Sequence, residues 1–86
     1  MTVYVPTPLR SYTQTRHTVE ANGTTLTQVL FDLDKQFPGI RFRIVNEQDQ
    51  VREHIKVFVN EDLAKNLSAS VRSDDKIHII CALSGG

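Results

Sequence analysis

The strongest constraint on the fold is one amphipathic helix in the first half of a short chain. Apolar residues recur there at the spacing of a single helix face, at Leu26, Val29, Leu30, Leu33 and Phe37. Thr25 is a suitable N-cap, Gln28 is its capping-box partner, and Pro38-Gly39 ends the pattern. A chain of 86 residues has room for one domain and one small core, so the other elements have to pack on this helix.

Strand-forming residues flank the helix on both sides. Before it, Val3 to Val5 form a short strand that two prolines stop, and Thr13 to Glu20 is predicted to be a second strand. We interpret these two runs as an antiparallel hairpin with a long loop. After the helix, His54 to Val59 is predicted to be a buried strand, and Lys76 to Leu83 is the strongest strand in the chain.

The segments between the later strands leave alternatives open. Ile40 to Gln50 is either a short strand or an irregular segment that packs under the helix, with a polar loop at its end. Asn60-Glu61-Asp62 and Ser73-Asp74-Asp75 are predicted turns. Leu63 to Leu67 is either a short strand or a single turn.

The order of these elements predicts an α+β fold of the β-grasp type. In this fold a mixed sheet of four to five strands curves around one main helix, and the first and last strands pair in parallel at the centre. Val3 to Val5 and Ile77 to Ile80 suit that position, because central strands are apolar on one or both faces. Residues 1–83 are expected to form the domain and residues 84–86 a flexible C-terminal tail.

Charge argues against a dedicated nucleic-acid or membrane binder. Ten basic and ten acidic residues cancel, whereas such binders usually carry a basic excess or stripe. Arg41, Arg43 and Arg52 could form a basic patch, but acidic neighbours dilute it. These neighbours are Glu47, Asp49 and Glu53.

The expected compartment is the cytoplasm. The N-terminus has no basic region followed by an apolar run, so it does not resemble a secretory signal. No stretch approaches the roughly 20 apolar residues that span a bilayer. Cys81 is the single cysteine and cannot form an internal disulfide, which favours a reducing environment. We expect the free protein to be a monomer.

The side chains best suited to catalysis or metal binding are scattered. His17, His54 and His78 lack the spacing of metal ligands, and we expect them at the surface or half-buried. Cys81 is interpreted as a small core residue within an apolar strand, not as a nucleophile. Asp74-Asp75 is interpreted as a solvated turn, with docking on a basic partner as the alternative. No metal site or bound cofactor is therefore expected.

Three segments carry a resemblance to a known family. They are the threonine-capped helix Thr25–Leu33, the strand and turn Val57–Asp62, and the segment Asp75–Gly86, which combines an acidic turn, an apolar strand and a terminal diglycine. Together they resemble the ThiS/MoaD family of ubiquitin-like sulfur carriers. That family includes carriers for thiamin, molybdopterin and cysteine synthesis. The chain length and the run Val5–Arg10 look closest to the cysteine-synthesis type.

The resemblance implies that the C-terminus is the chemical site. A ubiquitin-activating-type enzyme would use ATP to join the Gly86 carboxylate to AMP, and sulfide or a persulfide sulfur would then displace AMP to leave a thiocarboxylate. Gly85 and Ser84 would thread the tail into narrow channels, because residues with small or no side chains leave the backbone free. The chain would be a carrier that serves a sulfur-accepting biosynthetic enzyme, not a catalyst. Alone, a terminal diglycine is a weak signal, since it could be a cloning scar or a frayed end.

Docking on these enzymes is expected to use an exposed apolar sheet face near the tail. The candidates are Phe58, Ile80, Ala82 and Leu83, of which about half are expected to be ordinary core residues. Two other functions use the same sequence features. The chain could be a protein modifier attached to lysines through Gly86, or a non-covalent interaction domain that shares only the fold.

Overall fold

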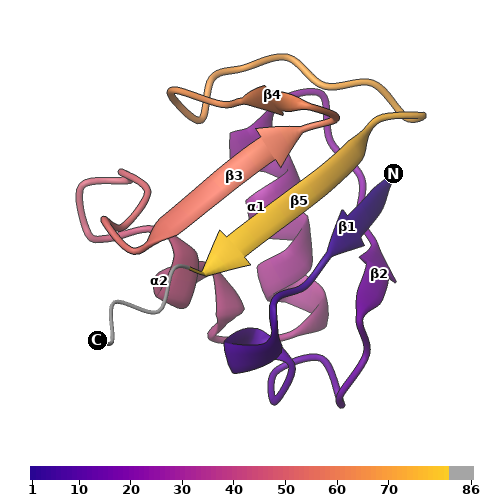
Figure 1. Cartoon of the computed structure of the whole chain (residues 1–86), viewed down its shortest axis with the longest axis vertical. Coiled ribbons are helices and arrows are strands. Elements are labelled where there is room, and N and C mark those ends of the chain that lie inside the picture. Colours follow the sequence, from indigo (N-terminus) through magenta and orange to yellow (C-terminus); the bar gives the residue numbers. More distant parts are fainter. Residues whose placement is uncertain (82–86) are drawn as a thin grey trace.

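The computed structural model describes residues 1–81, which form one mixed sheet packed on one main helix (Figure 1). The strands are β1 (Thr2–Tyr4), β2 (Thr18–Glu20), β3 (Ile55–Val59), β4 (Asp62–Leu63) and β5 (Lys76–Cys81). The helices are α1 (Leu26–Gln36), α2 (Ile40–Ile44) and a 3-10 turn at Thr7–Leu9. The sheet order is β2-β1-β5-β3-β4, with β1 and β5 parallel at its centre. This arrangement confirms the β-grasp fold predicted from the sequence.

Helix α1 begins and ends where its sequence signals predicted. The backbone N–H of Gln28 donates to the Thr25 hydroxyl oxygen at 3.3 Å, so Thr25 is the N-cap. The reciprocal bond of the expected capping box is shifted by one residue, since the Gln28 side chain accepts from the N–H of Thr24 at 2.8 Å. At the other end, Gly39 takes a φ of 98°, a left-handed conformation that suits glycine.

The segment after α1 corrects one expectation. Residues 40–44 are the short helix α2, and neither the predicted strand nor an irregular segment. Ile40 and Ile44 are both buried one helical turn apart, whereas Phe42 lies exposed between them. The Asp34 carboxylate accepts the N–H groups of Gly39 and Arg41 at 3.0 and 3.1 Å, which ties α2 to α1. Neither helix within residues 1–81 is long and apolar enough to cross a lipid bilayer.

Strand β2 is shorter than predicted. Residues 18–20 pair with β1, but residues 13–15 form a turn and residues 16–17 lie outside the strand, instead of forming its expected first part. Gln14 and Thr15 both have positive φ angles, and the buried Thr13 hydroxyl donates to the Arg16 carbonyl at 2.9 Å. The threonine-rich composition suited a strand, but this local side-chain bond stabilises the turn. The segment 63–67 likewise contributes only Leu63 to β4.

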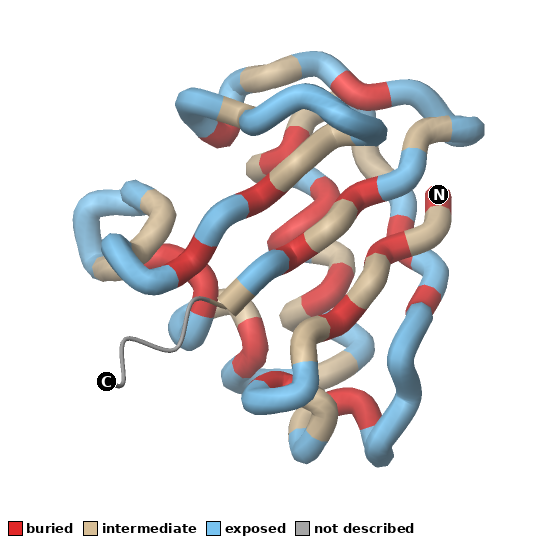
Figure 2. Tube along the Cα trace, viewed as in Figure 1, coloured by how far each residue is buried: buried red, intermediate tan, exposed pale blue. Residues whose placement is uncertain are grey.

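The core lies between α1 and one face of the sheet (Figure 2). Alternate residues of each strand point inward, so β5 buries Ile77 and Ile79 while β3 buries Ile55 and Val57. They pack with the fully buried face of α1. That face is Leu26, Val29, Leu30 and Leu33. Phe37 packs at the edge of this core.

The difference in burial between Leu33 and Leu63 predicts that their substitution by alanine lowers the free energy of unfolding by very different amounts. Leu33→Ala should lower the free energy of unfolding by about 2–5 kcal/mol, because it removes buried contacts and leaves a cavity. Leu63→Ala is the matched control, since that side chain is 47% exposed, and it should cost less than about 1 kcal/mol. Urea denaturation measures both values. Equal losses would contradict this placement of the core.

Candidate functional site

The candidate site is the end of β5, from which the chain continues into residues 82–86. β5 pairs with β3 over residues 77–81, from Val59↔Ile77 to Ile55↔Cys81. On its other side it pairs with β1 only as far as Tyr4↔His78. The last described residue, Cys81, is therefore held in register by Ile55. Of the predicted site residues, Gly86, Gly85, Ser84, Ala82 and Leu83 lie outside the described residues.

A hydrogen-bonded clamp fixes the start of β5. The side-chain amide of Asn60 donates to Asp75 at 3.0 Å, and the Asn60 side-chain oxygen accepts the N–H of Lys76 at 3.0 Å. Asp75 also accepts the N–H of Arg72 at 2.8 Å. The Arg72 N–H, followed by the Asn60 amide, lowers the pKa of the Asp75 carboxyl. The turn predicted at Ser73-Asp74-Asp75 is thus structural as well as solvated, because it ties β5 to the turn after β3.

A row of side chains crosses the outer face of the sheet. Strand pairing aligns Tyr4, His78, Phe58 and Leu63 on β1, β5, β3 and β4. The Tyr4 and His78 rings stack with centroids 4.4 Å apart and planes 8° apart. Ile80 lies two residues further along β5, opposite Lys56, and is 47% exposed. We call Tyr4, His78, Phe58, Leu63 and Ile80 the outer apolar face.

Two of the four predicted docking residues are on this face. Phe58 is half-buried and Ile80 is exposed, so neither is an ordinary core residue. Tyr4, His78 and Leu63 belong to the same surface but were not predicted as docking residues. Strand alternation was the available signal, because Tyr4 lies between two inward valines and His78 between two inward isoleucines. Their alignment across three strand pairs follows only from the register.

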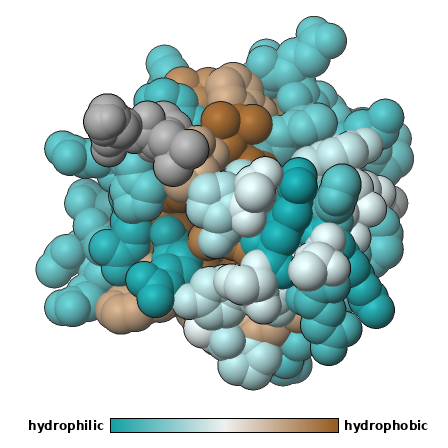
Figure 3. Space-filling model, turned by 60° about the horizontal axis from the view of Figure 1, so that its bottom comes forward, coloured by the Kyte–Doolittle hydropathy of each residue, from teal (hydrophilic) through white to brown (hydrophobic). Residues whose placement is uncertain are grey.

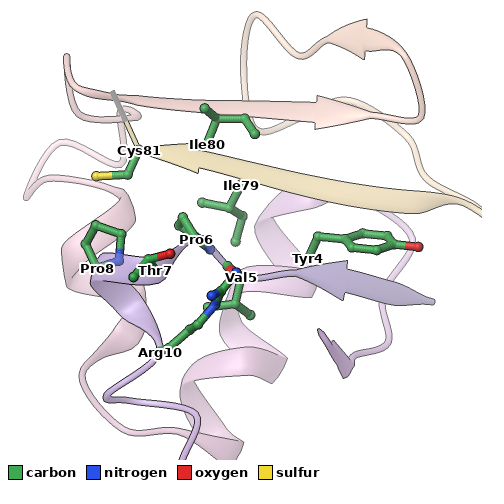
Figure 4. A pocket seen from close by; sticks show the side chains of 9 residues that line it. All are labelled: Tyr4, Val5, Pro6, Thr7, Pro8, Arg10, Ile79, Ile80 and Cys81. Atoms are coloured by element: carbon green, nitrogen blue, oxygen red, sulfur yellow. The ribbon is translucent and has the colours of Figure 1, made fainter. Parts of the chain in front are cut away.

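A cavity of about 380 Å³ lies beside the last residues of β5 (Figure 4). It opens there because Pro6 and Pro8 turn the chain away after β1, which leaves residues 79–81 without a neighbouring strand on that side. The lining includes Pro8, Ile80 and the half-buried Cys81, and Figure 4 shows the Cys81 sulfur above the Pro8 ring. Arg10 holds the loop by donating from Nε to the Val5 carbonyl at 3.0 Å.

The described part of the chain holds no cluster suited to a metal ion. Among residues 1–81 no three or more histidine, cysteine, aspartate or glutamate side chains gather in a metal-binding geometry. His17 and His54 are exposed, and His78 stacks on Tyr4. Cys81 packs against the edge of the core. Residues 1–81 thus provide three features: a strand end held by pairing with β3, an exposed apolar face, and a cavity beside both.

Comparison with known proteins places the chain in a family. A model described as the ThiS family matches residues 3–86. The sulfur carrier protein CysO of Mycobacterium bovis is 30% identical over 91 residues, which cover 100% of this chain and 98% of CysO. CysO of Mycobacterium tuberculosis strain H37Rv gives the same values. The family resemblance expected from the sequence is confirmed.

Solved structures agree with this assignment. CysO in the Amycolatopsis orientalis BexX/CysO complex has a TM-score of 0.91 and 34% identity, covering 99% of this chain and 98% of that one. Mycobacterium tuberculosis CysO has a TM-score of 0.90 and 28% identity, covering 95% and 98%. The small archaeal modifier protein 1 of Haloferax volcanii has a TM-score of 0.79 at 23% identity, covering 100% and 98%, which shows the shared fold alone.

The clamp at Asp75 predicts that the wild type and Asp75→Asn differ in stability by an amount that depends on pH. The native pKa of Asp75 lies below its ordinary value of 3.8, so the ionised carboxylate stabilises the fold fully above that value. This stabilisation is lost as the pH falls from 3.8 through the native pKa. Asp75→Asn should therefore be less stable than the wild type at pH 7, and the two should converge in acid.

The measurement is the urea midpoint of both proteins across the acidic range. Asp74→Asn is the matched control, because no bond to the neighbouring Asp74 side chain contributes to the clamp within residues 1–81. A gap for Asp75→Asn that stays constant down to the lowest pH would show that charge is not its cause.

Proposed function

The chain belongs to the ThiS family, and we propose that this sulfur carrier holds its cargo at the carboxylate of Gly86. The observation that carries the proposal is the full-length likeness to CysO, at 30% identity over 100% of the chain. The chain has the terminal diglycine that such chemistry uses. Its role is that of a protein co-substrate, which is consumed and regenerated by partner enzymes.

The proposed loading has two steps, both at the Gly86 carboxyl carbon. A carboxylate is a poor electrophile, because attack would have to expel oxide. One carboxylate oxygen therefore attacks the α-phosphorus of ATP, which releases pyrophosphate and forms an acyl adenylate. Hydrogen sulfide anion then attacks the carbonyl carbon, the carbon–oxygen bond to AMP breaks, and one proton is released. The product is a thiocarboxylate, whose anionic sulfur attacks an electrophilic carbon on the acceptor.

The described structure supports a division of labour between strand and tail. Strand β5 is paired with β3 up to Cys81 and clamped at its start by Asp75, so the base of residues 82–86 has a fixed position on the globule. Gly85 and Gly86 carry no side chains, which favours passage through a narrow channel. Ordering such a segment costs about 1–2 kcal/mol per residue, which docking of the globule has to offset.

Two partner enzymes follow from this chemistry. One is a ubiquitin-activating-type enzyme that binds ATP and the sulfur source, and the other is the biosynthetic enzyme that accepts sulfur. The BexX/CysO complex of Amycolatopsis orientalis is one case in which a similar chain assembles with a second protein. For this chain we propose that the outer apolar face docks on both enzymes, with Ile80 as its exposed side chain next to the end of β5. An exposed apolar patch on a folded domain is typical of an interface.

Attachment to lysines would use the same activated terminus. The likeness to the archaeal modifier proteins, at 21% and 23% identity, reaches only the fold. CysO shares more of the sequence over the same length, so sulfur transfer is the favoured function.

Loading predicts a defined change of mass. Incubation with the activating enzyme, ATP and sulfide should convert the chain to a species in which one oxygen is replaced by one sulfur, as measured by intact mass spectrometry. A variant without Gly86 is the control, because it ends one residue short of the catalytic centre and should stay unmodified. The proposal fails if the intact chain stays unmodified while the enzyme forms adenylate with it.

Docking predicts a change in KM without a change in turnover. Ile80→Lys should raise the KM for the chain in the loading reaction by about tenfold and leave kcat nearly unchanged, because it puts a charge into an apolar interface. Phe31→Lys is the matched control, since Phe31 is 53% exposed but lies on α1, away from the sheet face. Equal KM values for both variants would show that the outer apolar face does not dock.

A further inference from the structure

Three arginines lie over aromatic rings near the end of the sheet. The guanidinium carbon of Arg41 is 4.3 Å from the Phe31 ring centroid, that of Arg43 is 5.9 Å from Tyr12, and that of Arg52 is 5.3 Å from Phe42. Arg41 is paired with Asp49. Within residues 1–81, Arg43 and Arg52 form no ion pair.

Arg43 and Arg52 face a common cavity. It has a volume of about 470 Å³, and no acidic side chain of residues 1–81 lines it. The lining is Tyr12, Gly39, Phe42, Arg43, Arg52 and His54. A second cavity of about 320 Å³ shares Tyr12, Arg43 and His54 with the first and reaches Cys81. We call the two together the basic groove. It runs from Arg52 to Cys81, the last residue of β5. Figure 3 turns forward the end of the molecule at which the 3-10 turn lies, and Pro8 and Leu9 of that turn line the second cavity.

The two guanidinium groups are held in place before any ligand binds. Arg43 donates from Nε to the Tyr12 hydroxyl oxygen at 2.6 Å, and Arg52 donates from Nε to the Phe42 carbonyl at 2.9 Å. Within residues 1–81 the terminal nitrogens of both groups make no hydrogen bond. A planar guanidinium that is already stacked and bonded loses little conformational entropy on binding a carboxylate with its remaining N–H groups.

We propose that the basic groove binds an acidic segment of the enzyme that receives the tail, so this inference rests on the proposed function. The chain has zero net charge, and within residues 1–81 the groove holds two arginines that form no ion pair and has no carboxylate in its lining, so positive charge is concentrated there. Both cavities are open along one side, which suits a segment of a protein surface better than a small molecule, whose sites usually enclose most of the ligand. The groove ends at Cys81, so its ligand would border the entrance that the tail uses.

The groove would act together with the outer apolar face. Apolar contact supplies affinity, whereas paired charges orient the partners and speed their encounter. An acidic segment beside the entrance of the enzyme's channel would fix the orientation in which the globule docks. That orientation would direct the C-terminus into the channel. Arginine suits this role because its planar guanidinium group binds a carboxylate through two parallel hydrogen bonds.

The first experiment titrates the ¹⁵N-labelled full chain with a hexa-aspartate peptide and follows the Nε–H signals of Arg43 and Arg52 by NMR. Saturable shifts at both, abolished by high salt, are expected, whereas a hexa-asparagine peptide should cause none. Arg43→Gln and Arg52→Gln should each weaken binding about tenfold, and Lys35→Gln, on the exposed side of α1, should leave it unchanged. Equal shifts at all cationic residues, or tighter saturation by inorganic phosphate or AMP, would overturn the proposal.

The second experiment measures loading by the activating enzyme at low and high salt. Arg52→Gln should raise the KM for the chain about tenfold at low salt with kcat unchanged, and the difference should shrink at high salt. Thermal unfolding checks that each variant is folded. Unchanged KM values would overturn the inference while leaving sulfur loading intact. Loss of loading in the wild type would instead contradict the proposed function. The peptide titration would still decide whether the basic groove binds an acidic segment.

Discussion

The parallel pairing of β1 with β5 is the interaction on which the rest of the structure depends. It joins residues 2–4 to residues 76–78, so the two ends of the described chain meet at the centre of the sheet. Parallel strands cannot be joined by a tight turn, and the intervening chain has to cross over the sheet. Helix α1 is the main part of that crossover, and it buries its apolar face against the inner side of both strands. β5 then adds β3 on its other edge, which makes it the best-supported strand.

This central position has a functional consequence. Because β5 is held on both edges at its start and on one edge at its end, the segment after Cys81 leaves from a fixed point. Helix α1 covers one face of the sheet, and within residues 1–81 the other face presents Tyr4, His78, Phe58, Leu63 and Ile80. β1 stops before β5 does, which opens the cavity beside the exit point. The outer apolar face and the cavity beside Cys81 thus both depend on β5 and on the unequal lengths of the strands beside it.

Local sequence signals predicted the secondary structure correctly where no other interaction competed with them. The threonine cap, the apolar face and Pro38-Gly39 placed α1, and the apolar run at 76–81 placed β5. The failures came where side chains competed with propensity. The Thr13 hydroxyl donates to a nearby carbonyl and stabilises the turn at residues 13–15. In α2, burial of Ile40 and Ile44 under α1, together with the Asp34 contacts, prevailed over the alternation that suggested a strand.

The sequence by itself determined the family, the order of the elements and the terminal diglycine, because these depend on residue types and their spacing along the chain. Only the tertiary structure decided which residues act together. Tyr4, His78, Phe58 and Leu63 become neighbours through strand register, in which a shift of one residue would turn each side chain to the opposite face. The sequence suggested that acidic neighbours dilute the arginines. In the fold, Asp49 pairs with Arg41, while Arg43 and Arg52 line a groove to which the described part of the chain contributes no carboxylate. Charges are neutralised by partners that are close in space, which need not be close along the chain.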